Sequence, residues 1–143
     1  MENNDLFNNI NLKRGISPYD HATGDAAVSS EIIDMQGNSS LTFAIATGSL
    51  ADADATFTVL VEDADEAAFN VTNAAVADAD LLGTEALASF IFSDDNKVFK
   101  IGYKGMKRYV RLTITPANNT GAALLAVIAI VTPRILPAAN PPA

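Results

Sequence analysis

The stretch Lys107–Thr115, which reads KRYVRLTIT, gives the clearest indication of a β-strand in this sequence. Val110, Leu112 and Ile114 take every second position, and Tyr109 with charged and polar side chains fills the positions between them. Side chains of a β-strand point alternately to its two faces, so this period predicts a strand with one face in a core and one in water. The wet face carries cations on a chain whose net charge is -8, so positive charge is concentrated here against the overall balance.

Other short segments give similar strand signals and are separated by turn residues. They are Val28–Met35, Leu41–Thr47, Ala55–Glu62, Phe69–Thr72, Ala86–Phe92, Lys97–Tyr103 and Ala123–Thr132. Many short strands at near-regular spacing, with almost no helix signal, are typical of an all-β domain. The sequence therefore predicts a single-domain antiparallel β-sandwich, jelly-roll-like, with about eight strands.

The last of these segments, Ala123–Thr132, is apolar on both of its faces. A helix is the competing interpretation, because Ala and Leu favour helices. The β-branched cluster between Val127 and Val131 and the short length of the segment favour a strand. A strand that is apolar on both faces lies either under two layers or against another subunit.

The two ends of the chain lack this periodicity. Residues 1–27 contain Gly15, Pro18 and Gly24 and predict an N-terminal arm. Residues 133–143 are rich in proline and predict an extended C-terminal tail, because proline cannot continue a central strand. The expected organisation is thus an arm at 1–27, a sandwich domain at 28–132 and a tail at 133–143.

Composition restricts the function classes. The chain has 143 residues, of which 49% are hydrophobic and 18% charged, which suits one folded domain with its own core. It has no cysteine, which excludes disulfides and thiolate chemistry. The acidic balance argues against nucleic acid as a partner. The longest apolar run, Ala122–Val131, is too short for a bilayer, and no signal peptide is recognisable at Met1, so we expect a protein made in a cytoplasm with no membrane partner.

Candidate catalytic and metal-binding residues are sparse. Aspartates occur in i, i+2 pairs, as at Asp52 and Asp54, but none follows the pattern of a dedicated calcium loop. The single histidine, His21, cannot form a multi-histidine metal site, and no nucleophile elbow accompanies it. We therefore expect no catalytic residue, no cofactor and no metal, and the protein is not expected to be an enzyme.

Charge is segregated along the sequence, and this points to an interface. Most of the cations lie between Lys97 and Arg111, and most of the acids lie between Asp52 and Asp95. Opposite patches on one domain can orient copies of the same chain, although solvated surface charge is the alternative. Gly105 is expected at a hairpin turn with a positive φ, which would align the cations on one exposed edge.

Arg and Tyr are the residue types that anchor protein interfaces, so Arg111 and Tyr109 are the best anchors. The full set of residues that we expect at this interface is Lys100, Tyr103, Lys104, Lys107, Tyr109, Arg111, Leu125 and Val127.

Two motifs carry a resemblance to a known group of proteins. Residues 80–87 read DLLGTEAL, and residues 97–115 read KVFKIGYKGMKRYVRLTIT; before them residues 41–69 read LTFAIATGSLADADATFTVLVEDADEAAF. In this order, from about Ile32 to Pro133, the chain resembles small structural proteins of tailed bacteriophages that are encoded near the major capsid protein. The resemblance implies a virion component without enzymatic activity, and it identifies no catalytic residues.

The resemblance implies a decoration or cement protein on the outer surface of a phage capsid. Its expected partners are the major capsid protein and copies of itself, for instance as a trimer, and its expected location is the virion. A head–tail connector or a tail component is the alternative within virions. A carbohydrate-binding β-sandwich module is a further alternative, against which the absence of Trp counts. An accessory or inhibitor domain of an enzyme is the remaining one.

Overall fold

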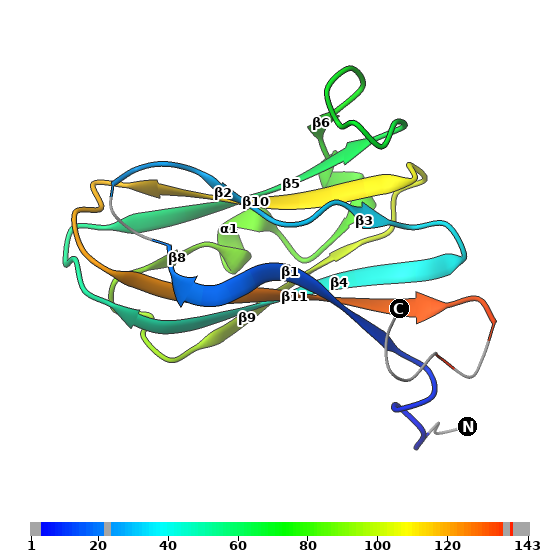
Figure 1. The fold of residues 1–143 in the computed structure, drawn as a ribbon, viewed down its shortest axis with the longest axis horizontal. Helices are drawn as coiled ribbons and strands as arrows, with labels where there is room; N and C mark the ends of the chain where they lie inside the picture. Colours follow the sequence, from blue (N-terminus) through cyan, green and yellow to red (C-terminus); the bar gives the residue numbers. More distant parts are fainter. Residues whose placement is uncertain (1–3, 22–23, 136–137, 139–143) are drawn as a thin grey trace.

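Two antiparallel sheets pack face to face in the computed structural model, which describes residues 4–21, 24–135 and 138 (Figure 1). The first sheet, sheet A, has five strands. In spatial order they are β1 (Asn11–Asp20), β11 (Ala123–Pro133), β4 (Asn38–Leu50), β9 (Val98–Tyr103) and β7 (Leu81–Leu82). The predicted all-β antiparallel sandwich is confirmed.

The second sheet, sheet B, is built around β10 (Tyr109–Ala117) and β5 (Thr56–Ala64), which pair along their whole lengths. Short strands extend its two edges: β2 (Val28–Ser29) and β3 (Ile33–Asp34) pair with β10, and β6 (Ala74–Ala75) and β8 (Phe90–Ile91) pair with β5. The predicted strand at residues 28–35 is therefore present as two pieces.

The core lies between the sheets and is filled by the alternate positions of the long strands. Val110, Leu112 and Ile114 are fully buried, as the period of two predicted for β10. The rings of Phe57 and Phe90 are stacked with their centroids 4.9 Å apart. Phe99 of sheet A packs on Phe90 at 5.7 Å, so aromatic rings connect the two layers across the interior.

Two further elements lie between β6 and β8: the 3₁₀-helix η1 (Asp78–Asp80) and the helix α1 (Glu85–Ala88). The strand expected at residues 86–92 is wrong for its first half, which forms α1. Thr84 caps this helix, since its hydroxyl accepts a hydrogen bond from the backbone N–H of Leu87. The weak strand signal at residues 69–72 is also wrong, because these residues form a loop in which Phe69 has φ 53°.

The predicted N-terminal arm is a further correction. Residues 11–20 form β1, which pairs with β11 and closes one edge of sheet A. Ile16 of this strand is only 4% exposed and belongs to the core. The sequence did not predict this strand, because Gly15 and Pro18 are typical of loops. The register also shifts twice along β1, which interrupts the alternation of buried and exposed side chains. Most of the expected tail at 133–143 lies outside the described residues, and Pro133 is the last residue of β11.

The loops gather at the two ends of the sandwich, because the long strands run along its long axis (Figure 1). One end holds the turns at residues 35–37 and 104–108 and the segment after β11. The opposite end holds the loops at residues 51–55, 92–97 and 118–122. No described helix is long and apolar enough to cross a membrane.

Candidate interaction surfaces

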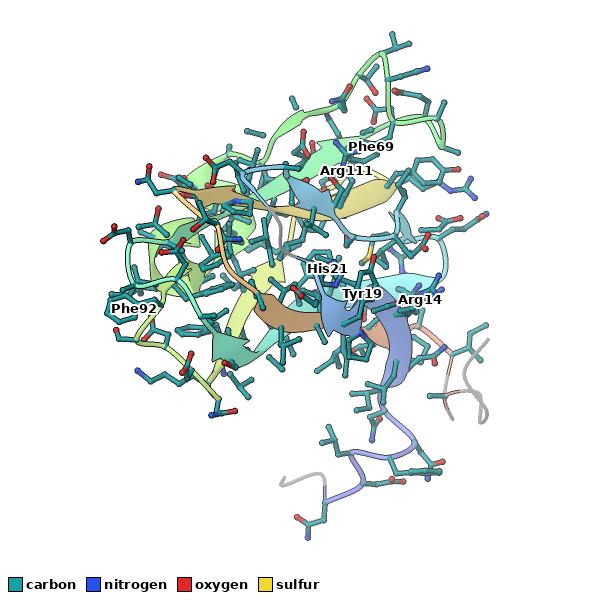
Figure 2. The ribbon with its side chains drawn as sticks, turned by 60° about the vertical axis from the view of Figure 1, so that its left-hand side comes forward. Arg14, Tyr19, His21, Phe69, Phe92 and Arg111 are labelled. Carbon is teal, nitrogen blue, oxygen red and sulfur yellow. The ribbon has the colours of Figure 1, made fainter. Side chains whose placement is uncertain are left out.

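The outer face of β10 does not present the free cations that its sequence predicts. The guanidinium of Arg111 lies 2.9 Å from the carboxylate of Glu62, its cross-strand neighbour on β5. The same guanidinium lies over the ring of Phe69, 4.5 Å from the centroid (Figure 2). Paired with an acid below and covered by a ring above, Arg111 is bound within its own domain.

The loop between β5 and β6 holds Phe69 in this place. One carboxylate oxygen of Glu66 accepts backbone hydrogen bonds from Asn70, Val71 and Thr72 at 2.7–3.0 Å. The hydroxyl of Thr72 donates to the other oxygen. These hydrogen bonds to the charged form lower the pKa of Glu66 to about 2.

Tyr103 is the first of the expected interface residues that the structure places in the interior. It is 1% exposed, and its hydroxyl donates to Asp63 at 2.9 Å while accepting from the backbone N–H of Lys107 at 3.1 Å. Burial and the bond to Asp63 raise the pKa of Tyr103. The ammonium of Lys107 lies 3.2 Å from Asp63. Tyr103 is thus a structural residue of the turn between β9 and β10.

Leu125 and Val127 are corrected in the same way. They lie on the inner face of β11 and are 4% and 1% exposed, so the packing of sheet A on sheet B already occupies them. Lys100 and Lys104 are exposed, but they do not share an edge with Arg111: Lys100 lies on sheet A and Arg111 on sheet B. The predicted interface is therefore divided among the core, two sheets and one end of the sandwich.

The other face of β11 belongs to an apolar surface on the outer side of sheet A. Ile130 pairs with Leu12 on β1 and with Thr42 on β4. Thr42 in turn pairs with Gly102 on β9, and Gly102 pairs with Leu82 on β7. Neighbouring rows along the same outer face add Ala44, Ala46, Val98, Leu124, Ala126 and Ile128. We call this surface, with Leu12, Leu82 and Ile130, the apolar face.

Several large side chains of the apolar face are well exposed: Val98 at 73%, Leu82 at 54%, Ile128 at 47% and Leu12 at 45%. The aligned positions carry three charges, all at the rim: Asp20 beside Leu124, Arg14 beside Ile128 and Lys100 beside Ala44. A contiguous exposed patch of this kind is typical of a protein–protein contact. The double-sided apolar pattern of residues 123–132 was the sequence signal for it.

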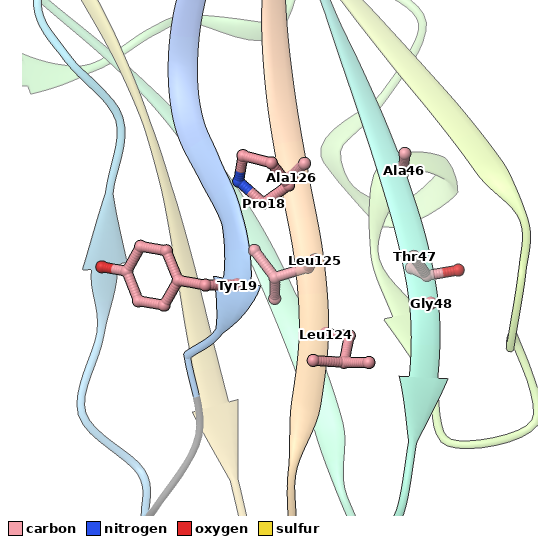
Figure 3. Close-up of a pocket in the computed structure, with 8 residues that line it drawn as sticks. All are labelled: Pro18, Tyr19, Ala46, Thr47, Gly48, Leu124, Leu125 and Ala126. Carbon is pink, nitrogen blue, oxygen red and sulfur yellow. The ribbon is translucent and has the colours of Figure 1, made fainter.

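One corner of the apolar face is hollowed (Figure 3). The hollow has a volume of about 330 Å³ and lies where Pro18 and Tyr19 of β1 face Ala46, Gly48 and Leu124. Tyr19 is 59% exposed, and its ring lies beside that of His21 at a centroid distance of 3.8 Å, with the two planes tilted by 35°. The described atoms around this hollow are mainly carbon, so it suits an apolar side chain.

A more polar hollow lies on the other side of Tyr19, between β1 and β2. It has a volume of about 370 Å³ and is lined by Arg14, Ser17, His21 and Glu31 among others. Arg14 and Glu31 form an ion pair of 2.7 Å across it. The imidazole Nε2 of His21 lies 2.7 Å from the carbonyl oxygen of Ser17, which fixes the orientation of the ring.

Acid pairs in the described part of the chain have structural partners in several places. Asp52 accepts hydrogen bonds from the backbone N–H and the hydroxyl of Thr120, both at 2.7 Å. Asp63 binds Tyr103 and Lys107. Across residues 4–21, 24–135 and 138, no group of three or more His, Asp or Glu is placed to hold a metal ion.

Comparisons with known proteins give no family assignment. No protein-family model matches the chain, and no curated protein does. Among solved structures, it is similar to the CBM22-1–GH10 modules of the Clostridium thermocellum N-terminal endo-1,4-β-D-xylanase 10B in complex with xylohexaose. The identity is 12% and the TM-score 0.41; the match covers 94% of this chain and 28% of that one. A similarity this low carries no argument about function.

Proposed function

We propose that this protein is a non-catalytic structural component that binds a protein shell through its apolar face. The observation that carries the proposal is the row of exposed Leu, Ile and Val side chains across sheet A, with charge confined to the rim. Water contact with these side chains is unfavourable by about 25 cal/mol for each Å². Association with another protein surface removes that contact.

The resemblance of residues 80–87 and 97–115 to phage head proteins supports a particular shell, the outer surface of a phage capsid. A decoration protein binds many equivalent sites on a lattice, so modest affinity at each site is sufficient. A sheet face suits such a site, because its rows of side chains can contact another protein surface side by side. A head–tail connector would use the same face against a ring of subunits.

The experiment is a co-sedimentation assay with heads assembled from the major capsid protein alone. The substitution Ile130→Asp puts a carboxylate in the apolar face between Leu12 and Thr42 and should weaken binding at least about tenfold, because an unpaired charge in an apolar contact is costly. Thr58→Asp, on the outer face of sheet B, is the matched control and should bind like the unchanged protein. Equal binding by both variants would contradict the proposal.

A specific observation favours carbohydrate binding as the second candidate. Tyr19 presents an exposed ring beside a hollow that contains Arg14, Glu31 and Ser17. An aromatic surface next to hydrogen-bonding groups is the arrangement that sugars require. Binding on a glycan array that Tyr19→Ala abolishes would support this candidate, whereas an array without signal would remove it.

A further inference from the structure

The two ends of the sandwich differ in charge. At the end formed by the turns after β3 and β9, a hollow of about 330 Å³ is lined by four cations and no acid; the cations are Lys104, Lys107, Arg108 and Arg134. They come from the turn at residues 104–108 and from the segment after β11, which the strands bring together. We call this the cationic hollow. On a chain of net charge -8, such a gathering of positive charge marks a site for an anionic group.

Acids of the same chain neutralise half of these cations. Arg108 forms two hydrogen bonds with Asp34, at 2.9 and 2.8 Å, and Lys107 lies 3.2 Å from Asp63. No ion pair involves Lys104 or Arg134 within the described residues, and the guanidinium of Arg134 donates to the carbonyl oxygen of Asn38 at 3.1 Å. The cationic hollow therefore keeps positive charge on Lys104 and Arg134.

The lining of the cationic hollow favours a protein loop over a small anion or a nucleic acid. Two methionines belong to it: Met35, which also packs on the core, and Met106, which is 98% exposed. Exposed Met side chains adapt to irregular apolar surfaces and are frequent at protein contacts, as is Arg. The acidic remainder of the surface would repel a long polyanion. The partner expected here is an acidic loop with some apolar atoms.

The opposite end of the same molecule has this chemistry. Asp52 and Asp54 lie in the loop after β4, and Asp94 and Asp95 lie in the loop after β8, among alanine, serine and phenylalanine side chains. Lys97, the cation within this loop, is paired with Asp94 at 2.8 Å. The described loops at this end are therefore net acidic.

Hydrogen bonds hold these acidic loops in place. Asp52 binds Thr120 of the neighbouring loop. Asp95 accepts from the backbone N–H of Leu50 at 2.8 Å, and Asp94 accepts from that of Ile91 at 2.9 Å. A loop that is already ordered loses less conformational entropy when it binds.

We propose that the cationic hollow binds the acidic end of a second copy of this chain, with Lys104 and Arg134 opposite Asp54 of the neighbour. Such a contact is head-to-tail: each copy binds one neighbour through its cationic hollow and the other neighbour through its acidic loops. A head-to-tail contact produces a ring if the rotation between copies closes and an open row if it does not. The contact leaves the apolar face free, so it goes beyond the proposed shell binding and does not depend on it.

Charge reversals at the two ends test the arrangement by sedimentation velocity at low salt. Lys104→Glu removes the binding end, and Asp54→Lys removes the bound end; Asp54 is exposed and its carboxylate supports no other loop in the described structure. Each variant alone should associate at least about tenfold more weakly than the unchanged chain. An equimolar mixture of the two should associate again, since a normal hollow meets a normal acidic end at one contact and a reversed hollow meets a reversed end at the next. The double variant should associate again, because its reversed charges attract each other.

The matched control is Lys100→Glu, which makes the same charge change on the outer face of sheet A and should leave self-association unchanged. Circular dichroism confirms that each variant is folded, and Arg134→Glu replaces Lys104→Glu if that variant is not. A wild-type chain that stays monomeric, or a mixture that forms no dimers, would overturn the proposal. Loss of self-association by Lys104→Glu with normal loading onto heads separates this contact from shell binding.

Discussion

Gly105 allows the turn between β9 and β10 to fold back over the ring of Tyr103. A Cβ at this position would lie 2.5 Å from the Tyr103 hydroxyl oxygen and 2.6 Å from two ring carbons. The sequence suggested a positive φ here, but Gly105 is not among the residues in that region. The glycine is needed for close approach, because the ring passes beneath the backbone to reach Asp63.

The substitution Gly105→Ala should therefore lower the free energy of unfolding by about 1–3 kcal/mol, since the ring or the turn must shift to admit the methyl group. Chemical denaturation measures this loss. Gly121→Ala is the control. A Cβ at this position would lie 3.2 Å from the nearest atom, so the free energy of unfolding should fall clearly less. Equal losses in both variants would show that the Tyr103 ring does not restrict position 105.

At the scale of elements, the DLLGTE string has a structural explanation. The hydroxyl of Thr84 caps α1, and the carboxylate of Glu85 accepts a hydrogen bond from the backbone N–H of Val61 at 2.7 Å. Ser89 accepts from the N–H of Val59 at 3.0 Å. Between the places where β6 and β8 pair with β5, no strand binds the backbone of β5. The side chains of Glu85 and Ser89 accept hydrogen bonds from its backbone N–H groups there. The motif therefore supports sheet B through Glu85, while its Leu82 belongs to the apolar face of sheet A.

The sequence predicted the elements whose packing follows a simple period, and missed those that depend on distant partners. β10 and β11 follow their alternation closely, because one face of each meets the core. β1 was read as an arm, since only its pairing with β11 orders Gly15 and Pro18. The part of the apolar face that β11 contributes was predicted from its apolar residues. The parts that contain Leu12, Gly102 and Leu82 could not be predicted, because they depend on how four other strands pair in the sheet.

The loop held by Glu66 gives a pH dependence. Because the pKa of Glu66 is lowered from 4.5 to about 2, its carboxylate stabilises the folded state fully above about pH 4.5, and this stabilisation is lost as the pH falls towards 2. The free energy of unfolding should therefore decrease less steeply over this range in Glu66→Gln than in the unchanged protein. Urea titrations at stepwise pH measure the difference. Asp65→Asn, which removes a neighbouring charge, is the control, and an unchanged slope in Glu66→Gln would contradict the assignment.

At the scale of the whole molecule, charge and apolar area are separated in space. The apolar face covers one side of sheet A, the cationic hollow lies at one end, and the acidic loops lie at the other. A sheet contact and an end-to-end contact can therefore form at the same time without competing for residues. The charged β10 face, which was the expected anchor, is instead used to attach the β5–β6 loop through Glu62 and Phe69.

The edge position of β1 leads to the last prediction. If residues 11–20 were an arm, deleting residues 1–20 would leave the domain intact. In the structure β1 covers the edge of β11 and buries Ile16, whose burial alone is worth about 1.5–3 kcal/mol. The deletion should lower the melting temperature by at least about 5 °C and cause aggregation through the opened edge.

Deletion of residues 1–10, which ends just before β1, is the control and should lower the melting temperature much less. Scanning calorimetry and light scattering measure both effects, and a monomeric 21–143 chain of unchanged stability would refute the role given to β1.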